Sequence, residues 1–280
     1  MNLTAARALI SVILMAAAMS GCVSALAQTQ QERQHCDGEQ GTTPEQRIAG
    51  CTAVIRGGRD KGENLAETFN SRGVAYRMKG EHDRAIQDYS QAIKLFPKFA
   101  VAYNNRGVAY DKKGEYDRAI QDYEQSIRLK PSPQAYFNRG NAQLGASRYA
   151  AAIDDYNQAI RLQSDFGPAF DNRCWARAVL GLLKQALADC NEALRLMPNN
   201  IGTLDSRAFI FLKTMQLDAA VSDYDAALRT DPKLAFALYG RGLAKLKNED
   251  ATGEVDISAA KALQADIADE YARYGISDTR

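Results

Sequence analysis

Residues 66–99 read AETFNSRGVAYRMKGEHDRAIQDYSQAIKLFPKF, and residues 100–132 repeat the pattern as AVAYNNRGVAYDKKGEYDRAIQDYEQSIRLKPS. The pattern continues to residue 263, so the chain contains six copies: 66–99, 100–132, 133–166, 167–200, 201–234 and 235–263. Self-similarity at this period predicts a helical solenoid, in which each unit buries its apolar face only against its neighbours. We therefore predict an all-α chain of helix–turn–helix units.

An arginine and an aspartate stand at fixed positions in every copy. Counted from the first residue of each copy, arginine is at position seven, and aspartate follows 16 residues later, or 15 in the last copy. Both positions are equidistant from a turn near position 15, so an antiparallel hairpin places them at one level. We expect six structural ion pairs: Arg72–Asp88, Arg106–Asp122, Arg139–Asp155, Arg173–Asp189, Arg207–Asp223 and Arg241–Asp256. The alternative, a cationic stripe that binds acidic ligands, is less favoured because an aspartate accompanies each arginine.

Small and aromatic residues complete the repeated framework. Residues at position eight and position 20 are small, aromatic residues recur at positions four, 11 and 24, and proline at position 32 ends the second helix in most copies. These features resemble the tetratricopeptide repeat family over residues 66–263. The resemblance implies a right-handed superhelical solenoid that binds proteins. Gln143, Arg177 and Lys245 depart from it, because they replace the aromatic residue at position 11.

The resemblance also implies a concave groove lined by positions two, five, nine, 12 and 13 of the first helices. The candidate groove residues are Asn70, Val74, Asn104, Val108, Phe137, Asn141, Asp171, Trp175, Phe209, Leu212, Phe236, Tyr239 and Leu243. We expect a mixed, polar groove in the first two copies and an apolar one from the fourth onward. An exposed Trp175–Phe209 patch would mark a binding site. The alternative is that a capping helix or a second copy of the chain covers this face.

The first 27 residues predict an export signal. Arg7 precedes an apolar run, residues 8–19, that is too short to span a bilayer comfortably. Residues 25–27 read ALA, which fits a cleavage site and places the mature amino terminus at Gln28. The predicted location is therefore periplasmic or secreted, and no later apolar segment is long enough to form a membrane helix.

A competing interpretation lies within the same segment. Residues 19–22 read MSGC, which resembles a bacterial lipobox with Cys22 as the lipidated residue. Under that alternative the chain is an outer-membrane lipoprotein, and the lipid would be its only membrane contact.

Four cysteines remain beyond Cys22, and an even number in an oxidising compartment predicts two disulfides. Three pairings are open, of which the local one is Cys36–Cys51 with Cys174–Cys190. The alternative for Cys174 and Cys190 is a pair of buried thiols that act as small apolar residues. The segments outside the repeats are predicted to be a flexible linker (28–43), a flanking helix (44–62), and a capping helix with a tail (264–280).

Charge and motifs exclude several classes of function. The 35 lysines and arginines nearly balance the 34 aspartates and glutamates, which argues against a nucleic-acid partner. We identify no catalytic motif, cofactor or metal site and expect no enzyme. The predicted function is a scaffold that binds another protein or peptide of the cell envelope. The alternatives are a lipoprotein that assists pilus or secretion assembly and a self-associating homo-oligomeric array.

Overall fold

A computed structural model describes residues 29–276, and helices are the only regular secondary structure over that range. The predicted signal peptide (1–27), Cys22 and Gln28 lie outside the described residues. Within residues 29–276, every helix is too short or too polar to cross a membrane. The chain divides into two compact units, one ending at Lys130 and the other starting at Pro131.

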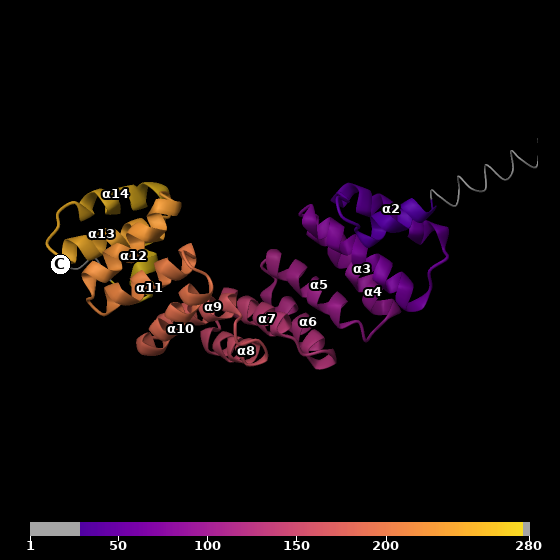
Figure 1. Ribbon diagram of the computed structural model, residues 1–280, viewed down its shortest axis with the longest axis horizontal. Helices are drawn as coiled ribbons and strands as arrows, with labels where there is room; N and C mark the ends of the chain where they lie inside the picture. The colour runs from indigo at the N-terminus through magenta and orange to yellow at the C-terminus, as the bar shows by residue number, and fades with distance from the viewer. Residues whose placement is uncertain (1–28, 277–280) are drawn as a thin grey trace, which may run out of the picture. The chain divides into compact units, whose positions relative to one another are not determined.

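Six helical hairpins make up the repeats, and the two helices of each hairpin pack against each other (Figure 1). The hairpins are α3 (Gly62–Met78) with α4 (His82–Leu95), α5 (Ala100–Lys112) with α6 (Tyr116–Leu129), α7 (Pro133–Gly145) with α8 (Tyr149–Leu162), α9 (Gly167–Val179) with α10 (Leu183–Leu196), α11 (Ile201–Lys213) with α12 (Leu217–Thr230), and α13 (Ala235–Lys247) with α14 (Gly253–Leu263). The prediction of an all-α helical repeat solenoid is confirmed. The first two hairpins belong to the first unit, and the other four to the second.

Close approach within each hairpin explains the pairing of a small residue at position eight with an aromatic residue at position 24. A Cβ atom on Gly73 would lie 2.7 Å from Cε1 of Tyr89, and Gly107 has the same relation to Tyr123. The tyrosine ring therefore rests directly on the backbone of the first helix. In the fourth copy these two positions hold Cys174 and Cys190, and a disulfide replaces the ring contact.

The turn at position 15 adopts a left-handed backbone conformation in all six repeats. Gly80, Gly114 and Gly181 have φ between 73° and 76°. The other three repeats use Ser147, Met215 and Glu249, with φ between 58° and 62°. The conformation is thus kept where glycine is absent, at a local energetic cost.

The segment before the repeats differs from the predicted flexible linker. Residues 29–37 are helical, and the Cys36–Cys51 disulfide attaches them to α2 (Pro44–Gly57). Gly50 allows this contact, because a Cβ atom there would lie 2.5 Å from the carbonyl oxygen of Glu32. The predicted flanking helix (44–62) is also shorter than expected, since α2 ends at Gly57 and Gly58 has a left-handed backbone.

The chain ends in α15 (Ile267–Arg273), a helix of seven residues where a capping helix is predicted. Gly275, at φ 80°, reverses the chain, and the amide of Ile276 donates to the carbonyl oxygen of Tyr271 over 3.1 Å. Ile267, Tyr271 and Ile276 are buried in the second unit. This segment therefore packs against the repeats instead of extending away from them.

Candidate functional site

The arginine at position seven binds the aspartate of its own hairpin in all six repeats. Each guanidinium donates from Nε and Nη2 to the two carboxylate oxygens of its aspartate, over 2.6–2.9 Å. The six aspartates are buried. The structure thus brings together every predicted pair: Arg72–Asp88, Arg106–Asp122, Arg139–Asp155, Arg173–Asp189, Arg207–Asp223 and Arg241–Asp256.

The remaining guanidinium nitrogen, Nη1, joins one helical unit to the previous one at Arg72, Arg106, Arg173, Arg207 and Arg241. Nη1 of Arg106 donates to Ser90 Oγ (3.0 Å), and Nη1 of Arg207 donates to Asn191 Oδ1 (2.9 Å). Equivalent bonds join Arg72 to Thr52, Arg173 to Asn157 and Arg241 to Asp225. Sequence reasoning missed these contacts, although an acceptor 16 residues before the arginine was a usable signal in four of the five.

Two departures from the family pattern reinforce the same aspartates. Arg177 and Lys245 replace the aromatic residue at position 11, and each binds the aspartate of its own hairpin: Asp189 at 2.6 Å and Asp256 at 2.9 Å. The hydrogen bonds that Arg72 and Arg106 donate to Asp88 and Asp122 raise the pKa of the two arginines. We call the six position-seven arginines the arginine ladder. Their guanidinium groups bind aspartates within the repeats, and these contacts do not favour a cationic stripe that binds external anions.

Both predicted disulfides are present. The Cα atoms of Cys36 and Cys51 are 4.5 Å apart, and those of Cys174 and Cys190 are 5.3 Å apart. All four cysteines are buried. Within residues 29–276, no group of histidine, cysteine, aspartate and glutamate side chains is suited to hold a metal ion.

We call Asn70, Val74, Asn104 and Val108 the amide face; they lie on α3 and α5 of the first unit and are half-buried. Asn105, which sequence reasoning missed, donates from Nδ2 to Asn70 Oδ1 over 2.9 Å and links the two helices. Amide groups and valine methyl groups thus share this face, as the sequence predicts for the first two copies.

The predicted groove residues of the third repeat and the start of the fourth are half-buried in the second unit. Phe137 packs its ring 5.1 Å from that of Phe166. Asn141 accepts hydrogen bonds from Tyr156 (2.9 Å) and Asn172 (2.8 Å). Asp171 accepts one from Thr203 (2.8 Å), and burial raises the pKa of this carboxyl group. The polar groups of this region are therefore engaged with neighbouring helices.

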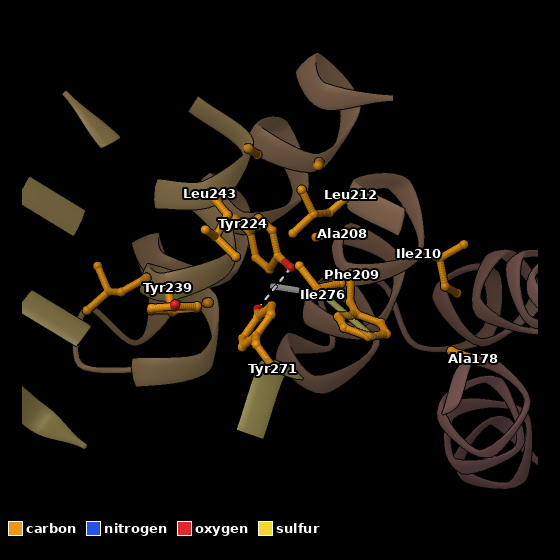
Figure 2. Packing of buried hydrophobic residues seen from close by; sticks show 14 of the residues in the cluster. Ala178, Ala208, Phe209, Ile210, Leu212, Tyr224, Tyr239, Leu243, Tyr271 and Ile276 are labelled. Atoms are coloured by element: carbon orange, nitrogen blue, oxygen red, sulfur yellow. Dashed lines mark hydrogen bonds between the residues drawn. The ribbon is translucent and has the colours of Figure 1, made fainter. Parts of the chain in front are cut away.

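We call the groove residues of repeats four to six the aromatic face: Trp175, Phe209, Leu212, Phe236, Tyr239 and Leu243. The expectation that this groove is open is wrong for four of them, since Phe209, Leu212, Tyr239 and Leu243 are at most 2% exposed. They belong to one apolar cluster with Tyr271 and Ile276 of the C-terminal segment (Figure 2). For Phe209 and Tyr239 the chain's own end supplies the cover, since the Tyr271 ring lies 5.9 and 4.9 Å from their rings, which is the capping alternative.

Tyr271 and Tyr274 make most of this cover. The Tyr271 ring stacks 4.3 Å from that of Phe236, and the Tyr274 ring meets that of Trp175 edge-on at 5.1 Å. The Tyr271 hydroxyl donates to the carbonyl oxygen of Phe236 (2.8 Å) and lies 3.2 Å from the Tyr224 hydroxyl. Because Tyr271 has one hydroxyl proton, Tyr224 donates the second bond, which Figure 2 shows as a dashed line.

Asp205, on α11, is an unusual carboxyl group beside this contact, at position five of its repeat, one of the positions that the resemblance assigns to the groove. Its Oδ1 atom is buried and, among the described residues, receives no hydrogen bond. Burial, together with the charge of Glu270 on α15, raises the pKa of Asp205 to about 8. This carboxyl group is therefore mostly protonated at neutral pH.

Comparisons with known proteins agree with this architecture. Family models described as "Tetratricopeptide repeat" match residues 100–133 and 133–166, and one described as "TPR repeat" matches residues 73–114. A search of curated proteins finds no match.

Solved structures of similar fold cover more of the chain. YrrB, described as a TPR protein with an unusual peptide-binding site, is 23% identical over 66% of this chain and 97% of its own, with a TM-score of 0.53. MamA is 25% identical over 58% and 96%, with a TM-score of 0.53. The Pseudomonas aeruginosa protein pilF is 19% identical over 76% and 97%, with a TM-score of 0.61.

Proposed function

Because this chain is a tetratricopeptide repeat protein, we propose that it is an exported scaffold whose amide face binds a segment of another cell-envelope protein. The fold itself supports a protein–protein interaction scaffold, and proteins of this kind are generally not enzymes. The export signal read in residues 1–27 supports the location. Two disulfides in the chain are consistent with an oxidising compartment.

The observation that carries the proposal is the difference between framework and face positions. The framework positions are the arginines at position seven and their partner aspartates, which form hydrogen bonds with each other and with neighbouring repeats, as Arg106 does with Asp122 and Ser90. Positions five and nine of the first two repeats instead present neutral amide and valine side chains that are partly exposed: Asn70, Val74, Asn104 and Val108. These are the positions at which the resemblance to tetratricopeptide repeats implies ligand contact.

The chemistry of the amide face fits an extended peptide. Asparagine side chains both donate and accept, so they can pair with the backbone amide and carbonyl groups of a bound segment. Val74 and Val108 offer apolar contact to alternate side chains of that segment. Main-chain pairing supplies affinity, and the apolar positions supply selectivity.

In-cell crosslinking followed by capture tests this proposal. One variant carries Asn70→Ala, Val74→Ser, Asn104→Ala and Val108→Ser; its matched control carries Gln87→Ala and Gln121→Ala, two exposed positions on the second helices of the same repeats. We expect the control to retain one specific envelope protein and the face variant to lose it while its circular dichroism stays unchanged. Equal capture by both would contradict the amide face as the site.

A lipid-anchored form is the second candidate, because residues 19–22 read MSGC. Incorporation of labelled palmitate at Cys22, abolished by Cys22→Ser, would establish the anchor. An amino terminus at Gln28 would exclude it.

A further inference from the structure

We propose that residues 264–276 act as a built-in, displaceable occupant of the aromatic face. The partner that displaces them would be a short helix bearing two aromatic side chains one turn apart, as Tyr271 and Tyr274 are. The inference rests on the proposed function only in taking the first-helix face as a recognition surface. Its test uses this chain's own segment, so it can fail while the amide-face proposal stands.

The reach of the segment is the first argument. A helix that only closed the end of the array would contact the last hairpin, α13 and α14. Tyr274 instead packs against Trp175 on α9, two repeats earlier, and its carbonyl oxygen accepts a hydrogen bond from Lys213 Nζ on α11 over 2.8 Å. The segment thus contacts the first helices of three successive repeats, which is how a ligand lies in a groove.

The seat for Tyr271 is built into one repeat and absent from the others. A Cβ atom on Gly240 would lie 2.3 Å from the hydroxyl oxygen of Tyr271 and 2.3 Å from that of Tyr224. Gly240 occupies position six of the last copy. In the other copies this position holds a side chain: Ser71, Asn105, Asn138, Asn172 and Ser206. Glycine at this single place admits the tyrosine hydroxyl, so the contact is specific.

Several features weaken the docking of residues 264–276 and so favour their displacement by a partner helix. The helix that these residues form, α15, has seven residues, too few to be stable when it leaves the repeats. Asp205 keeps a buried oxygen without a hydrogen bond in the same region, and burial lowers the pKa of Lys213, which holds the end of the segment. Each cost reduces the net free energy of docking. A partner helix that pairs these groups better would compete effectively.

Because residues 264–276 are attached to the repeats, the attachment determines how strongly they weaken binding of a partner. A short linker holds an attached segment at an effective concentration on the order of millimolar, so it excludes weak competitors. A partner's apparent affinity falls by the fraction of molecules in which the face is open. If the face is open in about 1% of molecules, release of the segment strengthens partner binding about 100-fold.

A labelled synthetic peptide of residues 264–276 is the probe for the test, added to the full-length exported protein. In the variant Tyr271→Ser/Tyr274→Ser the tethered segment loses both rings, while the aromatic face keeps its own residues. We expect this variant to bind the peptide at least tenfold more tightly than the wild type by fluorescence anisotropy. The matched control Ala272→Ser/Arg273→Ser changes two exposed residues of the same helix and should behave as the wild type.

Two further measurements fix the site. Gly240→Ala added to the Tyr271→Ser/Tyr274→Ser variant fills the seat and should abolish binding of the peptide. A peptide with serine at both tyrosine positions should not bind any form of the protein. Binding that survives Gly240→Ala places the peptide elsewhere and overturns the proposal.

Several outcomes contradict the proposal directly. If the Tyr271→Ser/Tyr274→Ser variant folds by circular dichroism but binds the peptide no better than the wild type, the segment is a permanent cap. Should the variant unfold, hydrogen exchange of the wild type decides: amides of residues 267–276 that open before the repeats support displacement, and exchange only by global unfolding overturns it. Wild-type dimers that dissociate on peptide addition would make a second copy, rather than a partner helix, the occupant. None of these outcomes affects the capture experiment on the amide face.

Discussion

Val74 on α3 and Phe209 on α11 both stand at position nine of their repeats, but their surroundings differ. Val74 is half-buried and belongs to the amide face of the first unit. Phe209 has no exposed surface, because Tyr271 and Tyr274 pack their rings 5.9 and 6.1 Å from its ring. A repeat position therefore fixes the direction in which a side chain points. Its exposure depends on whether another part of the chain lies across it.

The largest difference between the two faces should appear in stability. Phe209→Ala removes a fully buried ring and should lower the free energy of unfolding by about 3–5 kcal/mol. Val74→Ala removes two methyl groups at a half-buried position and should lower it by less than about 1 kcal/mol. Urea denaturation followed by circular dichroism measures both. Trp175, which lies 5.5 Å from Phe209, reports on the second unit by its fluorescence. Equal losses for the two variants would show that the segment 264–276 does not cover Phe209 in solution.

The arginine ladder should behave alike in both units, which makes it the internal reference for the comparison. Arg106→Ala leaves Asp122 buried without its main partner, and Arg207→Ala does the same to Asp223. Each change should cost about 3 kcal/mol, because an unpaired buried carboxylate is strongly unfavourable. The arginine side chains are 20% and 24% exposed, so the two losses should be similar. Denaturant midpoints of the two variants test this, and a loss in only one unit would contradict a shared framework.

Contacts between positions that recur in every repeat could be predicted from the sequence, whereas most contacts that occur once could not. The Arg–Asp spacing recurs six times, so one geometric argument at the level of the hairpin predicts every pair. The Cys174–Cys190 bond follows in the same way, because positions eight and 24 face each other in a hairpin. The sequence left open whether Phe209 is exposed or covered by a capping helix or a second copy, since the answer depends on one glycine, Gly240, and on a segment outside the repeats. The helix at residues 29–37 was missed for a similar reason: its composition is polar, and contacts outside the repeats hold it, namely the Cys36–Cys51 disulfide and the Arg33–Asp60 ion pair.

The folding stability should depend on pH through Asp205, which lies beside the aromatic face. Its pKa is about 8 in the folded protein, against an ordinary value of 3.8, because it is buried near Glu270, Tyr224 and Tyr271. The folded state therefore holds a proton that the unfolded state releases above about pH 4. Stability should fall as pH rises from about 4 to about 8 and then level off.

Asp205→Asn should remove this decline and raise the free energy of unfolding above pH 8 by several kcal/mol, since a rise of one in pKa corresponds to about 1.4 kcal/mol and no charge is then buried. Thermal unfolding of the wild type and the variant between pH 4 and pH 9 measures the difference. Asp269→Asn, at an exposed position of α15, is the control and should keep the wild-type profile. A variant that follows the wild-type profile would show that Asp205 is ionised and solvated in the folded state.

The smallest effect on stability is expected at the amide face, and there it should be separable from binding. Asn70→Ala removes the acceptor for Asn105 Nδ2, a half-buried hydrogen bond between α3 and α5, and should lower the free energy of unfolding by about 0.5–1 kcal/mol. Asn105→Ala removes the donor of the same bond and should cost a similar amount, but it leaves the side chain at position five in place. If the amide face binds the partner's backbone, Asn70→Ala should weaken capture more than Asn105→Ala at matched stability. Parallel losses of capture in the two variants would show that the bond between the helices, rather than the exposed amide, matters to the partner.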